Sequence, residues 1–170
     1  MPANVESMFY VGTTPWHREG KKLNDPPTTI EAIKSAGLDW NVEKAQLYLA
    51  GNRLIDEYFG IKRLDKDKVF GIVKKEYQIL QNSEAFNFFD PLLSSRFIDY
   101  ETAGSIGEGE IIWILAKIRQ GGSFKVHGND EIIKYLLLSN SHDGHSAVSI
   151  KFTPIRVVCQ NTLNIALKEN

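Results

Sequence analysis

Pairs of short apolar segments, each joined by a polar or glycine-rich turn, constrain the fold of this sequence more than any other feature. The segments 58–61 and 69–73 flank the charged turn 65–68, and the segments 97–106 and 111–116 flank a turn at 107–109. A third pair, 132–138 and 147–153, is joined by a polar loop. This arrangement is typical of β-hairpins. The segment 111–116 has no polar residue, so we expect that strand to be buried on both faces.

Three further segments have helical patterns. Thr28 and Glu31 have the spacing of a capping box at a helix start. Asn82 or Ser83 can cap a second helix, which Pro91 limits or bends. The last segment has an apolar stripe made of Cys159, Leu163, Ala166 and Leu167. Because these helices stand between hairpins, we expect an α+β fold: a mainly antiparallel sheet built from hairpins, with about three helices packed on it.

The 170 residues suit one domain. Residues 1–27 are poor in periodic apolar positions, and we expect an extended lead-in that docks through Met8, Phe9, Tyr10 and Trp16. Residues 28–170 are expected to form the α+β domain itself.

Composition excludes several classes of protein. Apolar residues make up 42% and charged residues 24%, which argues against disorder, and the net charge of −1 argues against an indiscriminate nucleic-acid binder. A single cysteine cannot form an internal disulfide, and no apolar run approaches the length of a membrane span. The N-terminus lacks the basic and apolar regions of a secretory signal. We therefore expect a cytoplasmic protein with no membrane contact and no cofactor.

One hairpin is locally basic. Against Asp65 and Asp67 it carries six cations: Lys62, Arg63, Lys66, Lys68, Lys74 and Lys75. Phe59, Phe70 and Tyr77 are close in sequence. Cations that follow a phosphate backbone, together with rings that stack on bases, are what a single-strand binder needs. The alternative is an edge hairpin that its lysines protect, with the aromatic rings in the core.

The segment 140–145 brings His142, Asp143 and His145 together, and these are metal-ligand types. This pattern would suit a metal-assisted hydrolase or nuclease. The alternative is an ordinary hairpin loop, in which Asp143-Gly144 forms the turn and both histidines face solvent. We regard all three as weak metal candidates.

Cys159 stands where the last helix is expected to begin, a position that lowers a thiol pKa. A nucleophilic cysteine would need a base, for which His142 or His145 is conceivable. The alternative is a buried cysteine on the apolar stripe with Leu163. We assign no catalytic residue.

Several strings are more particular than a generic core. They are Thr14-Pro15-Trp16-His17 with Gly20, the segment 77–82, Leu138-Ser-Asn-Ser-His142-Asp143-Gly144, and Phe152-Thr-Pro-Ile-Arg156-Val-Val-Cys159-Gln-Asn161-Thr162-Leu163. With these strings the chain resembles the DUF932 domain family, the phage/plasmid-like proteins. The chain has Arg18-Glu19 where the family usually has Gly-Leu. Family members also usually continue past the last helix, so we expect the chain to be truncated relative to them.

The resemblance implies a role in the DNA replication, recombination or defence evasion of a mobile element. The resulting hypothesis is a nucleic-acid-binding or single-strand-annealing accessory, with single-stranded DNA as its partner. Arg156 would add a phosphate contact or pair with Asp143, and Asn161 and Thr162 could clamp the 140–145 loop to the last helix. An anti-defence protein that binds a host protein is a further alternative. Exposed hairpin edges also make a homo-oligomer conceivable.

Overall fold

The computed structural model describes residues 3–119, 121, 123–126 and 130–168. The strands are β1 (Val5–Val11), β2 (Lys21–Leu23), β3 (Val42–Leu49), β4 (Arg53–Arg63), β5 (Lys68–Lys74), β6 (Ile98–Ile106), β7 (Ile111–Ile118), β8 (Ser123–Val126), β9 (Asp130–Ile133), β10 (Tyr135–Ser141) and β11 (Ser149–Thr153). The helices are α1 (Thr29–Ser35), α2 (Asn82–Asn87), α3 (Asp90–Ser94) and α4 (Gln160–Lys168). The fold is α+β, as the sequence predicts.

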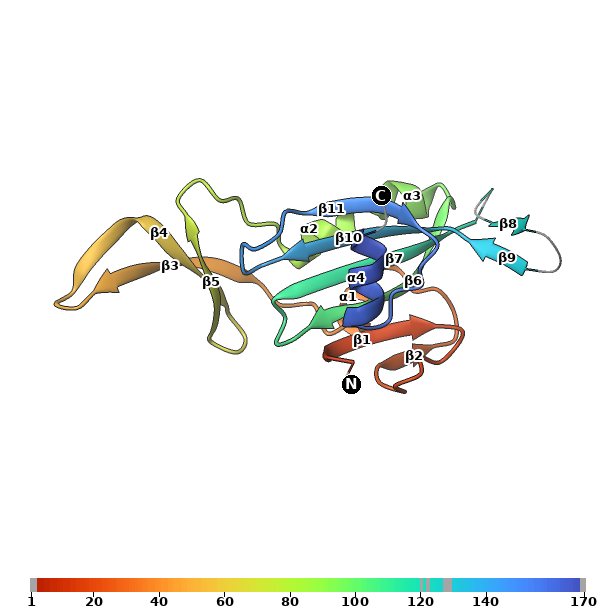
Figure 1. Cartoon of the computed structure of the whole chain (residues 1–170), viewed down its shortest axis with the longest axis horizontal. Helices are drawn as coiled ribbons and strands as arrows, with labels where there is room; N and C mark the ends of the chain where they lie inside the picture. The colour runs from red at the N-terminus through yellow and green to blue at the C-terminus, as the bar shows by residue number, and fades with distance from the viewer. Residues whose placement is uncertain (1–2, 120, 122, 127–129, 169–170) are drawn as a thin grey trace.

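Six strands form the main sheet, in the order β11-β10-β7-β6-β1-β2 (Figure 1). Every neighbouring pair is antiparallel except β1 and β2, which are parallel. The predicted hairpin at 97–116 is the pair β6–β7. The predicted hairpin at 132–153 is the pair β10–β11 from Tyr135 onward, whereas Ile132 and Ile133 belong to β9 and pair with β8 in a separate sheet. The segment 111–116 lies in β7, the third strand of the sheet, where neighbours on both sides and layers on both faces bury its side chains.

The N-terminal segment contributes more than a docked lead-in. Its strand β1 lies between β6 and β2 as an integral part of the main sheet. Met8, Phe9 and Tyr10 are buried there, as expected of anchors. Trp16 follows the strand in a turn and is 64% exposed, although its side chain hydrogen-bonds to the buried Cys159.

Helices cover both faces of the main sheet. One core contains the buried side chains of α1 and α2 together with one face of the sheet. The other core, on the opposite face, contains Leu163 and Ala166 of α4 (Figure 1). Thr28 caps α1 through the predicted capping box with Glu31. Pro91 divides the second helical segment into α2 and α3, since proline is favourable in a first turn and not in a helix interior.

A three-stranded sheet, β3-β4-β5, projects from one end of the main sheet, and the β8–β9 hairpin lies at the other end (Figure 1). We call residues 42–76, which contain β3, β4 and β5, the arm. The β4–β5 pair is the basic hairpin of the sequence, and β3 joins its other edge. Among the described residues, no helix is long and apolar enough to cross a membrane.

Candidate nucleic-acid interface

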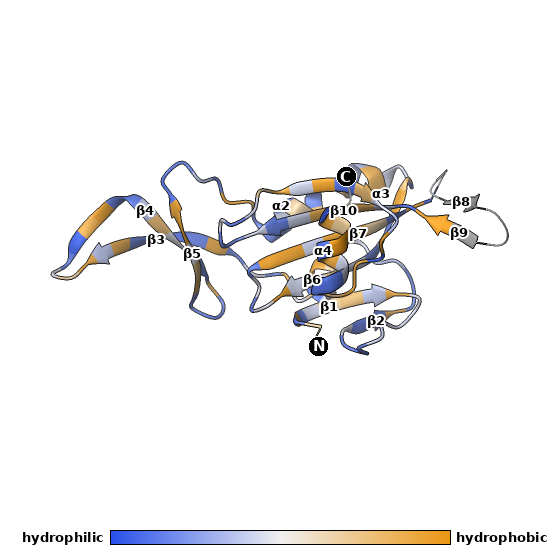
Figure 2. Ribbon diagram, viewed as in Figure 1, coloured by the Kyte–Doolittle hydropathy of each residue, from blue (hydrophilic) through white to orange (hydrophobic). Residues whose placement is uncertain are grey.

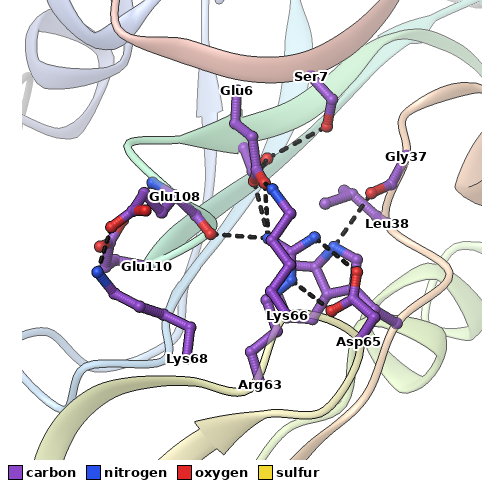
Figure 3. A network of polar contacts seen from close by, with 12 residues as sticks. Glu6, Ser7, Gly37, Leu38, Arg63, Asp65, Lys66, Lys68, Glu108 and Glu110 are labelled. Carbon is purple, nitrogen blue, oxygen red and sulfur yellow. Dashed lines mark hydrogen bonds and ion pairs between the residues drawn. The ribbon is translucent and has the colours of Figure 1, made fainter.

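Arg63 holds the arm to the main sheet (Figure 3). It is only 3% exposed, and its guanidinium carbon lies 4.1 Å from the centroid of the Trp40 ring. Its Nη1 donates to both carboxylate oxygens of Glu6 at 2.8 and 3.0 Å and to the Glu108 carbonyl at 2.7 Å. Its Nε and Nη2 donate to Asp65. Every nitrogen of the guanidinium is therefore engaged, and we remove Arg63 from the expected phosphate contacts.

Three of the remaining hairpin cations also have carboxylate partners. Lys66 bonds to Glu6 at 2.5 Å, and Lys68 bonds to Glu108. Lys62 pairs with Asp67 across the exposed turn at 2.5 Å. The acids Glu6 and Glu108 come from β1 and from the β6–β7 turn. Half of the local excess of positive charge in the sequence is thus balanced by two acids that are distant in sequence, Glu6 and Glu108.

The three aromatic rings expected to stack on bases are partly buried and pack against the core. Phe59 lies against the core and beneath the Lys44 ammonium. The Phe70 ring stacks on His142, and Tyr77 donates its hydroxyl hydrogen to the carbonyl of Ser141. Burial raises the pKa of Tyr77. These contacts occupy the three rings, so we do not assign them to base stacking.

A different ring is exposed on the outer face of the arm. Tyr58, which is 40% exposed, lies opposite Lys74 in the β4–β5 register. Both line an open pocket of about 450 Å³, together with Glu57, Lys75 and Glu76. Among the described residues, neither lysine takes part in an ion pair. We call this place the arm pocket.

The arm pocket arises from an irregularity in β4. Gln46 pairs with Phe59 but Leu47 pairs with Ile55, so residues 56–58 bulge out of the β3–β4 ladder. A bulge of this kind turns a side chain away from the regular pleat. The exposure of Tyr58 was not predictable from the sequence, because a bulge depends on the register of two strands and leaves no local motif.

The 140–145 loop places its two histidines in different environments. His142 is 1% exposed, and its Nε2 lies 2.8 Å from the Asn82 side-chain oxygen. Its ring packs between Trp40 and Phe70. Burial lowers the pKa of His142 to about 4, so the ring is neutral at pH 7. The expectation that both histidines face solvent is wrong for His142, because this residue packs against Trp40 and Phe70.

His145 remains on the surface, where its Nδ1 lies 3.0 Å from Asp143. Gly144 has a φ of +77°, which suits the predicted turn. Within the described ranges, no three histidine, cysteine or acidic side chains are arranged to share a metal ion. The weak metal candidates His142, Asp143 and His145 therefore do not converge, since His142 faces the interior.

Arg156 connects the two ends of the chain. Its Nε donates to Glu101 at 2.6 Å, and its Nη1 and Nη2 donate to the carbonyls of Thr13 and Val11. The expected pairing with Asp143 is wrong, because Arg156 follows β11 and reaches β6 and the end of β1. Its donors are engaged there, so we also remove it from the phosphate contacts.

Cys159 and Thr162 form the start of α4. The Thr162 hydroxyl accepts hydrogen bonds from the backbone N–H groups of Val158 and Cys159 and donates to the Cys159 carbonyl. Thr162 therefore caps its own helix, and it does not clamp the 140–145 loop as expected. Burial raises the pKa of the Cys159 thiol, but hydrogen bonds from Thr162, Asn161 and Trp16 outweigh this effect and lower it.

No histidine of the 140–145 loop serves Cys159 as a base. Cys159 is buried in the core on the α4 face, whereas His142 packs with Trp40 and Phe70 beside the other core. The histidine near Cys159 is His17, whose Nδ1 accepts from the backbone of Glu19. Its Nε2 therefore carries the hydrogen and donates to the Val158 carbonyl at 2.8 Å. His17 thus holds the N-terminal turn against the segment before α4.

The comparisons with known proteins give one family. A family model described as a domain of unknown function, DUF932, matches residues 69–170. No curated protein and no solved structure matches the chain. The matched stretch begins in β5 and contains Lys74, Lys75, the 140–145 loop and α4, while Tyr58 and the end of the arm lie outside it.

Proposed function

We propose that this chain, which belongs to the DUF932 family of domains of unknown function, binds single-stranded nucleic acid at the arm pocket. The observation that carries the proposal is the exposed Tyr58 ring opposite Lys74 and beside Lys75. A ring supplies a stacking platform, and stacking is worth about 1–3 kcal/mol for each base. The two ammonium groups supply the phosphate contacts.

Lys62 extends this surface along the arm. It lies four residues from Tyr58 on the same strand, β4. The separation is about 13 Å at the usual rise for each residue, a length that several linked phosphates can cover. The ion pair of Lys62 with Asp67 is exposed, so a phosphate can replace the carboxylate at little cost.

The arm pocket favours a single strand over a duplex. A base must leave its stack to lie on Tyr58, and a single strand offers such bases without unpairing. Glu57 and Glu76 line the same pocket and weaken phosphate binding. We therefore expect modest affinity that falls steeply with salt, in keeping with the net charge of −1. In a cell, such a protein would act as an accessory in the recombination or replication of mobile-element DNA.

Fluorescence anisotropy of a labelled oligothymidine tests the proposal across a salt series. Three phosphate contacts predict a slope of log K against log salt of about −2, at roughly −0.7 for each contact on a single strand. Lys74→Glu together with Lys75→Glu should reduce the magnitude of that slope by about 1.4. Tyr58→Ala should lower the affinity about tenfold or more while leaving the slope unchanged, because it removes stacking and no charge.

A matched variant controls for net charge. Lys22→Glu with Lys34→Glu changes the charge equally at two exposed positions on β2 and α1. It should bind almost as the native chain does. The proposal fails if no binding occurs at low salt, or if this control weakens binding as much as the arm-pocket variant does.

A further inference from the structure

The arm pocket is lined by charges of both signs that do not pair with one another. Lys74, Lys75, Glu57 and Glu76 all line it, and all four residues are exposed. In the part of the chain that the structure describes, none of the four takes part in an ion pair. Figure 2 shows hydrophilic colour where the chain leaves β5. The arm pocket therefore offers cations and anions that a ligand can engage without breaking a contact between them.

Phosphate accounts for the lysines of the arm pocket but not for its carboxylates. An ionised carboxylate is only a hydrogen-bond acceptor, so its partner in a ligand must be a donor. In a DNA strand the phosphates are acceptors, and the donors are the N–H groups at the edges of the bases. A pocket with both signs of charge thus suits a ligand that presents a phosphate and a donor-bearing base together.

The bulge in β4 brings a carboxylate to the same pocket as the stacking ring. Consecutive side chains of a regular strand point to opposite faces, yet Glu57 and Tyr58 both line the arm pocket. The bulge at residues 56–58 breaks the regular alternation. Glu76 follows Lys75, whose backbone N–H donates to the Glu57 carbonyl at 2.9 Å. A base that stacks on Tyr58 therefore has carboxylates near its edge.

We propose that the arm pocket selects guanine, whose N1–H and N2 amino groups donate to the carboxylate of Glu57 or Glu76. This inference rests on the proposed function. A single strand leaves the Watson–Crick edge of each base free. Guanine presents two adjacent donors on that edge, and they match the two oxygens of a carboxylate. Adenine and cytosine present one amino group beside an acceptor nitrogen, and thymine presents one N–H between two carbonyl oxygens, which repel a carboxylate.

Fluorescence anisotropy of short labelled oligothymidines that differ at one central base tests the selection. The strand with a central guanine should bind about fivefold more tightly than the strand with adenine, the lower limit for a good bidentate contact, because the pocket is open to solvent. Both bases are purines with a face that stacks, so the comparison isolates the edge. Hypoxanthine keeps N1–H but lacks the amino group, and it should lose most of the gain.

A variant without the two carboxylates tests the assigned residues. Glu57→Ala with Glu76→Ala should bind the guanine and adenine strands equally. It should also bind both strands more tightly than the native chain does at low salt, because the repulsion of phosphate is removed. Asp25→Ala with Asp39→Ala removes the same charge at two exposed positions on either side of α1. This matched control should keep the full preference for guanine.

The outcomes separate guanine selection from the proposed function. Equal binding of all strands at low salt overturns guanine selection and leaves the arm pocket as an unselective binding site. A preference for guanine that survives the loss of both carboxylates also overturns it, because the preference then arises elsewhere. Absence of binding by every strand overturns the proposed function and this inference together. Circular dichroism of each variant confirms that it is folded.

Discussion

Replacing Arg63 with methionine tests whether the arm is held by a buried charge. Methionine keeps a stem that can cover Trp40 but removes every hydrogen bond to Glu6, Asp65 and the Glu108 carbonyl. Removing one partner of a buried ion pair costs about 3–5 kcal/mol, since the other charge remains desolvated. Glu6 keeps its contacts with Lys66 and Ser105. We therefore expect a loss near the lower limit, about 3 kcal/mol in the free energy of unfolding.

Urea unfolding at pH 7, followed by tryptophan fluorescence, measures this loss. The double variant Arg63→Met with Glu6→Gln should lose less free energy of unfolding than the two single variants together, by at least about 1 kcal/mol. The reason is that Glu6→Gln removes the carboxylate that Arg63→Met leaves buried without its guanidinium partner. Lys62→Met breaks an exposed pair and is the matched control. The reasoning is refuted if Arg63→Met is tolerated as well as Lys62→Met, or if the two buried substitutions are additive.

Acid should reduce the effect of the Arg63 substitution. Burial raises the pKa of Glu6, but hydrogen bonds from Lys66 and Ser105 and the charge of Arg63 outweigh burial and lower it. An acid with a lowered pKa stabilises the fold above its ordinary pKa, and this stability is lost as the pH falls through the lowered value. The difference in the free energy of unfolding between the native chain and the Arg63→Met variant should therefore become smaller below about pH 4.

Three further substitutions test other parts of the structure. Gly104→Ala should cost about 3 kcal/mol in urea unfolding, because the added carbon would lie 2.3 Å from the carbonyl oxygen of Ser7. His142 has a folded pKa of about 4, below its ordinary value, so it stabilises the fold fully above pH 6.5 and progressively less toward pH 4. The native chain should lose about 2 kcal/mol through this group between pH 7 and 4.5, and His142→Gln should abolish that part of the loss. Thr28→Ala should lower the free energy of unfolding by about 1 kcal/mol through loss of the α1 cap, and an unchanged urea midpoint would contradict that role.

The strands of three hairpins were predictable from local sequence. Hairpin strands that are adjacent in the chain pair with each other, so the turns at 65–68 and 107–109 and the loop at 140–145 were enough to identify β4–β5, β6–β7 and β10–β11. The capping box of Thr28 and the break at Pro91 are also local. The place of β1 in the sheet was not predictable, because its partner β6 follows almost a hundred residues later.

The candidate site was predictable only in its location. The basic composition of the β4–β5 hairpin identified the arm, yet which cations remain available depends on acids distant in sequence. Glu6 is more than fifty residues from Arg63, and Glu108 is forty residues from Lys68. The sequence therefore overestimated the free positive charge of the hairpin.

By itself, the sequence determined the α+β class, the hairpins and the capped start of α1, because these depend on residues within a few positions of one another. It was wrong about the cap of α2, which is Gln81 and not Asn82 or Ser83. Only the tertiary structure decided which charged and aromatic side chains face solvent. It buried Arg63 and His142, stacked Phe70 on His142 and exposed Tyr58 at a bulge. The physical reason is that burial and ion pairing depend on contacts between segments that only the folded chain brings together.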